Sequence, residues 1–105
     1  MEFVETSIFT KWIQALLTED EYRNLQAALA TNPKIGDVIP GSGGLRKLRW
    51  ASGRQHRGKR GGIRVIYSCG SPHRLYMLFA YEKSQQGDLT KQQLDVLKAY
   101  IKRGI

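Results

Sequence analysis

In the first third of the chain, apolar residues recur every three or four positions, which is the period of an α-helix. One apolar stripe consists of Ile8, Phe9, Trp12, Ile13 and Leu16, and a second of Tyr22, Leu25 and Leu29. Residues three and four positions apart lie on one face of a helix, so the sequence predicts two amphipathic helices. Thr18 and Glu21 form a capping box that starts the second helix. Asn32-Pro33 ends it, because the residue before a proline is disfavoured in helical backbone.

Four further segments have the pattern of β-strands. Phe3-Val4-Glu5 predicts a short first strand, and three more strands are expected at 45–51, 63–68 and 75–81. In the first of these three, Leu48 and Trp50 point to one face while Lys47 and Arg49 point to the other. Segments rich in glycine, at 34–44 and 52–62, are expected to be loops.

A third helix is expected near the end of the sequence. Thr90 and Gln93 form a second capping box, which is followed by an apolar stripe of Leu94, Leu97 and Ile101. The short loops between the last three strands predict an antiparallel meander with the two N-terminal helices on one of its faces. We therefore expect a single α+β domain over residues 1–105, with a small antiparallel sheet, two N-terminal helices on one face and a C-terminal helix.

Positive charge is concentrated in one part of the chain. The 17 basic and 9 acidic residues give a formal net charge of +8. Eight basic residues and no acidic residue lie between Arg46 and Arg64. A solvated loop is the simplest explanation of such a run. However, the run begins inside an alternating apolar pattern, so we expect its charges to belong to a folded surface that binds a polyanion, in the first place nucleic acid.

The sequence gives little support to metal, thiol or membrane chemistry. Cys69, His56 and His73 have no spacing typical of metal ligands, and neither glycine-rich segment matches a phosphate-binding loop. We therefore expect no metal and no cofactor. A single cysteine is typical of a reducing compartment, and no apolar run is long enough to span a bilayer. The expected location is cytoplasmic, without a membrane partner.

The candidate chemistry lies on the sheet. Lys47, Arg49 and Arg64 are expected to share the face opposite Leu48, and Tyr81 is expected to leave the end of the last strand on the same side as Lys83. We expect this face to carry no carboxylate. Cations of this kind can stabilise the charge of a phosphorane, and a lysine among other cations can serve as a base. The same residues can also simply bind phosphate, and the sequence pattern does not separate the two functions.

Three segments of the chain carry a resemblance to a known family. They are residues 43–50 (GGLRKLRW), residues 58–67 (GKRGGIRVIY), and Tyr81-Glu-Lys83 followed by Asp88-Leu-Thr90. With them the chain resembles the RelE-like toxins of bacterial type II toxin–antitoxin systems, in particular the HigB-like branch. The resemblance implies a RelE-like fold and a ribosome-dependent, metal-independent mRNA endoribonuclease that inhibits translation. In such an enzyme the 2′-hydroxyl of the substrate attacks the adjacent phosphate.

The resemblance also assigns residues and partners. It implies catalytic roles for Lys47, Arg49, Arg64, Tyr81 and Lys83. We further expect RNA binding by the other basic residues in and beside the 52–62 loop, namely Arg46, Arg54, Arg57, Lys59 and Arg60. The implied partners are a helix-turn-helix antitoxin, the ribosome with its mRNA, and operator DNA reached only through the antitoxin complex.

Two alternatives stay open at this point. Ser84 stands where the RelE pattern has a further arginine, and Asp88 or Leu89 where it has a tyrosine, so the general base is not fixed. Lys83 is the preferred base because it leaves an ordered strand, and Lys59 and Arg60 are its alternatives. The alternative function is a non-catalytic RNA- or DNA-binding module that an acidic partner neutralises.

Overall fold

A computed structural model describes residues 1–51 and 62–103 of the chain. The described residues form an α+β domain, as the sequence predicts. Its elements are, in order, β1 (Glu2–Glu5), α1 (Ser7–Leu16), α2 (Glu19–Thr31), β2 (Asp37–Val38), β3 (Arg46–Trp50), β4 (Ile63–Ser71), β5 (Arg74–Glu82) and α4 (Lys91–Lys102).

The strands form one sheet in the order β1-β5-β4-β3-β2. The predicted meander is confirmed, because β3, β4 and β5 pair antiparallel. The expectation of a purely antiparallel sheet was wrong: β1 pairs parallel to β5, with Glu2 opposite Arg74. The chain connects these two parallel strands through most of the fold, and no local sequence pattern announces such a pairing. Two residues of the expected 34–44 loop also pair with β3 as β2.

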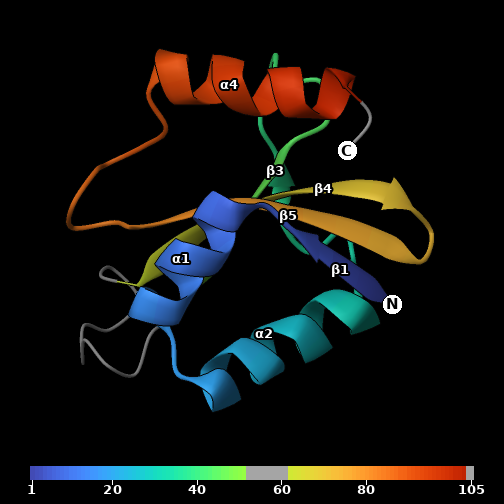
Figure 1. Ribbon diagram of the computed structural model, residues 1–105, viewed down its shortest axis with the longest axis vertical. Helices are drawn as coiled ribbons and strands as arrows, with labels where there is room; N and C mark the ends of the chain where they lie inside the picture. The colour runs from blue at the N-terminus through green and yellow to red at the C-terminus, as the bar shows by residue number, and fades with distance from the viewer. Residues whose placement is uncertain (52–61, 104–105) are drawn as a thin grey trace.

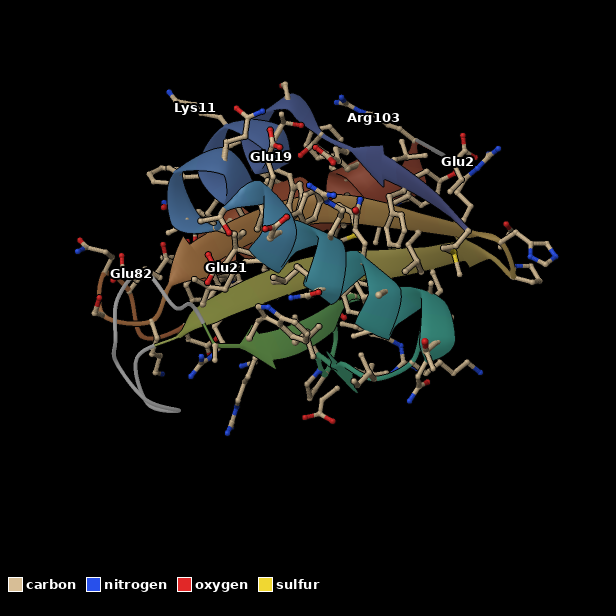
Figure 2. The ribbon with its side chains drawn as sticks, turned by 90° about the horizontal axis from the view of Figure 1, so that it is seen from below. Glu2, Lys11, Glu19, Glu21, Glu82 and Arg103 are labelled. Carbon is tan, nitrogen blue, oxygen red and sulfur yellow. The ribbon has the colours of Figure 1, made fainter. Side chains whose placement is uncertain are left out.

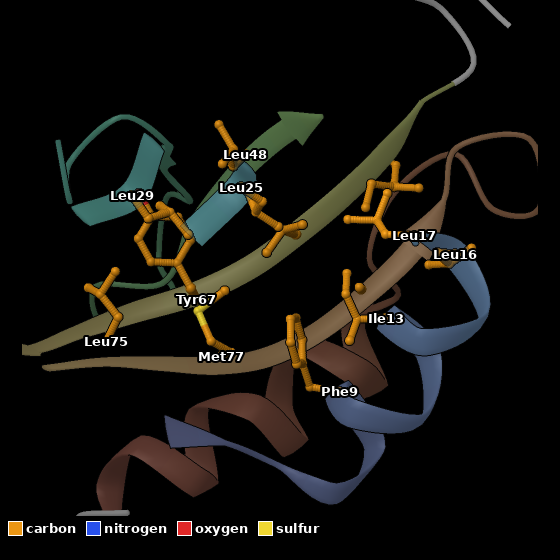
Figure 3. Packing of buried hydrophobic residues seen from close by; sticks show 13 residues of the cluster. Phe9, Ile13, Leu16, Leu17, Leu25, Leu29, Leu48, Tyr67, Leu75 and Met77 are labelled. Carbon is orange, nitrogen blue, oxygen red and sulfur yellow. The ribbon is translucent and has the colours of Figure 1, made fainter. Parts of the chain in front are cut away.

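Helices α1 and α2 cover one face of the sheet, as expected, and Figure 1 shows them together on the side away from α4. Between these helices and the sheet lies the larger apolar core, in which Phe9 and Ile13 of α1 and Leu25 of α2 meet Val65 and Tyr67 of β4. Figure 3 shows Tyr67, Met77 and Phe9 packed in this layer. Capping boxes start α2 at Thr18 and α4 at Thr90, which confirms both predicted helix starts.

Helix α4 covers part of the opposite face of the sheet (Figure 1). Its Leu97 packs in a second apolar cluster with Ile66 of β4 and with Leu78 and Phe79 of β5. Two consecutive residues of β5 reach this cluster because the pairing of β4 with β5 shifts register between Ile66 and Tyr67. The same face of the sheet carries the polar residues considered next, and one of them, Tyr81, belongs to the second apolar cluster.

No helix within the described ranges has the length and apolar character needed to cross a membrane.

Candidate nucleic-acid interface

Strand register brings four of the predicted site residues onto one face of the sheet. Arg49 of β3 lies directly opposite Arg64 of β4, and Arg64 lies directly opposite Tyr81 of β5. Lys47 lies two residues before Arg49, opposite Ile66, and therefore points to the same side. We call these four residues the cationic face. As predicted, it lies opposite the Leu48 and Val65 side, which packs against α1 and α2.

The two arginines of the cationic face form an unfavourable pair. Like charges that lie directly opposite each other on neighbouring strands destabilise a sheet. Arg64 is only 7% exposed, and its guanidinium donates a hydrogen bond to its neighbour, the Ile63 carbonyl, at 3.3 Å. Over residues 1–51 and 62–103, no carboxylate forms an ion pair with Arg49 or Arg64. A buried cation without a counter-charge costs stability, so this arrangement favours an anion from outside the described structure.

Tyr81 adds a buried hydroxyl to the row of arginines. The residue is 4% exposed, and its ring lies 5.9 Å from that of Phe79. Its Oη atom is buried and makes no hydrogen bond of normal geometry in the described part of the chain, but the Asp88 carboxylate lies close enough to interact with it. Burial and, second, the negative charge of Asp88 raise the pKa of Tyr81 to about 12, while the charge of Arg64 opposes this shift. Tyr81 is therefore a neutral phenol at physiological pH.

A hollow of about 320 Å³ lies at the end of β3, beside the two arginines. Arg49, Trp50, Ala51 and Arg64 line it. Two of its four lining residues are thus the opposed arginines. A group that enters this hollow meets two positive charges, one exposed and one nearly buried.

Lys83 follows β5 directly and lies close to the cationic face. Its backbone N–H donates to the Gly62 carbonyl at 3.2 Å, which continues the pairing of β5 with the start of β4. Its ammonium group donates to the Gly87 carbonyl at 2.6 Å. The side chain thus binds its own connection to α4, which is a different arrangement from a lysine that points freely at a substrate.

Arg46 belongs to the other side of the sheet. It lies opposite Tyr67, and its guanidinium donates to the carbonyls of Gly36 at 2.6 Å and Lys34 at 3.3 Å. The structure therefore gives Arg46 a role in holding the loop before β2 and does not bring it to the cationic face. The other four expected RNA-binding residues, Arg54, Arg57, Lys59 and Arg60, lie outside the described residues.

Asp88 stands near the place of a tyrosine in the RelE pattern, but its contact with the cationic face was not expected from the sequence. Its carboxylate lies 3.4 Å from Lys47 Nζ, so the expectation of a face without carboxylates was wrong. The backbone N–H of Leu89 and the charges of Lys47 and Lys83 hold the pKa of Asp88 below its usual range, although partial desolvation opposes them. The signal in the sequence is faint, because a single aspartate before a capping box is typical of a solvated loop.

A cluster of acidic residues lies on the opposite side of the sheet, at the start of α2. Three of them, Glu19, Asp20 and Glu21, occupy the first turn of α2. Figure 2, which views the molecule from the α2 side, shows Glu19 and Glu21 on this helix. Their negative charges favour the positive end of the helix dipole and keep that surface from attracting polyanions. The charge of the domain is therefore unequally divided between its two sides.

The described part of the chain offers no group of side chains suited to a metal ion. Over residues 1–51 and 62–103, no three histidine, cysteine, aspartate or glutamate side chains lie together in a way that could hold an ion. Cys69 is exposed, and its thiol lies 3.6 Å from the Pro33 carbonyl. No protein-family model matches the chain.

Proposed function

We propose that this protein is the toxin of a type II toxin–antitoxin system with a RelE-like fold, and that it cleaves mRNA on the ribosome as a metal-independent endoribonuclease. The observation that carries the proposal is the opposed pair of Arg49 and Arg64. The pair costs stability in the free protein, and its guanidinium groups are the groups that bind phosphate oxygens best.

In the proposed reaction, the scissile phosphate binds between Arg49 and Arg64. The 2′-hydroxyl of the preceding ribose attacks the phosphorus, and the 5′-oxygen of the following nucleotide leaves. The phosphorane that forms carries additional negative charge, which the two guanidinium groups stabilise. This contribution needs cations that are already in place before the substrate binds, and β-strand register supplies that fixed spacing.

Proton transfer in this reaction is assigned to the end of β5. Tyr81 remains protonated at physiological pH and is therefore suited to donate a hydrogen bond or a proton to an oxygen of the phosphorane or the leaving group. Lys83 is the proposed base, since it lies beside Tyr81 in the chain. To act in this way its amine must lose a proton and exchange its hydrogen bond with Gly87 for one with the 2′-hydroxyl.

The proposal includes partners that match the charge of the cationic face. An antitoxin with an acidic segment would neutralise the face by covering it, and the ribosome would present the mRNA to it. Contact with operator DNA is proposed only through the complex with a helix-turn-helix antitoxin. The alternative function, a basic module that binds nucleic acid without cleaving it, uses the same residues.

The proposed function is tested with Arg64→Gln. We expect this variant to lose about 10²–10³-fold in the rate of mRNA cleavage on the ribosome, because a contact to the transition state is removed. It should also relieve growth arrest in bacteria that express the protein. The matched control is Arg23→Gln, which changes the charge equally at an exposed site on α2 whose ion pair with Asp20 contributes little.

The outcomes separate the two functions. Growth arrest by the wild type and the control, without arrest by Arg64→Gln at equal soluble yield, supports the nuclease. Wild-type protein that binds RNA but neither cleaves mRNA nor arrests growth identifies the binding module instead.

A further inference from the structure

The connection between β5 and α4 carries a carboxylate onto the cationic face. Asp88 Oδ1 lies 3.4 Å from Lys47 Nζ, and the two residues are 41 positions apart in the chain. The side chain of Lys47 is 32% exposed and that of Asp88 is 71% exposed, so the ion pair lies at the surface. Water and solutes therefore reach both partners.

Asp88 differs from the other carboxylate near Lys47. Asp37 of β2 lies directly opposite Lys47 in the antiparallel pairing of β2 with β3, but no ion pair within 4.0 Å joins these two described residues. Asp88 is thus the acidic residue that contacts a cation of this face in the described part of the chain. The lower pKa of Asp88 agrees with this geometry, because Lys47 and Lys83 both stabilise its charged form.

Several hydrogen bonds hold the connection that carries Asp88. Lys83 Nζ donates to the Gly87 carbonyl at 2.6 Å. The amide of Gln86 donates to the Asp88 carbonyl at 2.9 Å and to the side-chain oxygen of Gln93 at 2.8 Å, and Gln93 itself belongs to the capping box of α4. The backbone of Asp88 is therefore held in place independently of Lys47, while the ion pair itself is an exposed contact of small net value.

A carboxylate and a phosphate present the same kind of acceptor to a lysine. Each offers negatively charged oxygens to the N–H groups of the ammonium, and a phosphate offers more of them. We infer that Asp88 occupies the place of a nucleic-acid phosphate on Lys47 in the free protein, and that a phosphate of bound RNA displaces its carboxylate. The identity of the ligand rests on the proposed function. Asp88 thus acts as a built-in competitor that lowers the affinity of the cationic face for RNA.

The test measures binding apart from cleavage. The probe is a short, fluorescently labelled, single-stranded RNA in which every ribose carries a 2′-O-methyl group, so that no attacking hydroxyl is present. Fluorescence anisotropy gives its dissociation constant at several salt concentrations. We expect Asp88→Asn to bind about threefold more tightly than Asp37→Asn at low salt, which is the scale of an exposed ion pair. The log–log salt slope should be nearly the same in the two variants, because Lys47 contacts a phosphate in both complexes.

The control removes the general effect of charge. Asp37→Asn makes the same charge change opposite the same lysine but breaks no ion pair, so it reports the long-range contribution alone. The double variants Lys47→Gln/Asp88→Asn and Lys47→Gln/Asp37→Asn complete the cycle. When Lys47 is absent, the difference between the two aspartate variants should vanish.

Three results overturn the inference. They are equal affinities of Asp88→Asn and Asp37→Asn, a difference that persists without Lys47, and no binding of the probe by any variant at low salt. The proposed nuclease activity is measured separately, as cleavage of unmodified mRNA on the ribosome. Tighter binding by Asp88→Asn together with no cleavage by the wild type supports this inference and removes the proposed function.

Discussion

Two side chains of the cationic face are buried in a way that costs stability. Arg64 is nearly inaccessible and has no ion-pair partner among the described residues, and Tyr81 buries a hydroxyl that makes no hydrogen bond of normal geometry there. Buried polar groups that lack partners are penalised in folding. Their presence side by side on paired strands is more readily explained by a bound anion than by a contribution to folding.

The variant Tyr81→Phe separates the effect of the hydroxyl on stability from its proposed role in cleavage. The substitution keeps the ring against Phe79 and removes an oxygen that makes no hydrogen bond of normal geometry among the described residues. We expect the free energy of unfolding at neutral pH to stay equal or rise by about 1 kcal/mol, as measured by chemical denaturation. Cleavage of mRNA should fall at the same time. A clear loss of stability would show that the contact of the Tyr81 hydroxyl with the Asp88 carboxylate stabilises the fold.

The stability of Tyr81→Phe should also depend on pH differently from the stability of the wild type. The raised pKa of Tyr81 means that the folded protein keeps this proton more firmly than the unfolded chain, whose phenol titrates near 10.0. Below pH 10 the phenol is neutral in both states and its titration does not affect stability, whereas from pH 10 toward 12 the unfolded chain ionises first and the folded state loses stability. The wild type should lose about 2 kcal/mol more than Tyr81→Phe over this interval. If the free energy of unfolding fell equally in the two proteins between pH 10 and 12, the raised pKa of Tyr81 would be contradicted.

At the scale of single elements, β3 divides its residues between a structural and a chemical face. Leu48 is 7% exposed and packs in the core beneath α1 and α2, while its neighbour Lys47 lies on the cationic face. Because the side chains of a strand alternate, substitutions one position apart should affect different properties of the protein.

We expect Leu48→Ala to lower the free energy of unfolding by about 2–5 kcal/mol, because it leaves a cavity in the core. Trp50→Ala should also destabilise, since Trp50 is partly buried against the same core. Thermal and chemical denaturation measure both effects. Lys47→Gln serves as the control on the opposite face and should shift the melting temperature little. Similar losses of stability in all three variants would show that β3 does not have one structural face and one chemical face.

The sequence was informative wherever a signal is local. Alternation in β3 predicted which side Lys47 and Arg49 occupy, and the threonines at 18 and 90 marked helix starts that the structure confirms. The position of Asp88 could not be predicted, because it depends on how the connection after β5 folds back toward β3. The parallel pairing of β1 is equally non-local. Patterns of neighbouring residues contain no information about such contacts.

At the scale of the whole molecule, the electrostatic field of the basic residues acts over the longest distance from the surface. The net charge of +8 is carried largely by the stretch from Arg46 to Arg64, which includes four cations outside the described residues. If these cations contact RNA phosphates, binding releases counterions and weakens as salt is added.

Neutralising two of these cations, in Arg54→Gln/Arg57→Gln, should make the log–log salt slope of RNA binding shallower by about one to one and a half units. Titrations of the 2′-O-methylated probe at several salt concentrations give this slope. Single-turnover cleavage of mRNA already bound on the ribosome should change less, because these charges are assigned to recruitment. An unchanged slope with a collapsed cleavage rate would instead place this segment in the reaction itself.

The parallel pairing of β1 with β5 also sets an order of events during synthesis. Glu2 and Arg74 are 72 positions apart, yet their side chains form an ion pair across the two strands. A nascent chain therefore presents β1 long before its partner has been made, and pairing at such separation is slow because the long loop must first be closed. Tyr81 lies on the same late strand as the partner of β1. The row from Arg49 to Tyr81 is consequently completed only after β5 has left the ribosomal tunnel, so an unfinished chain cannot carry the full cationic face.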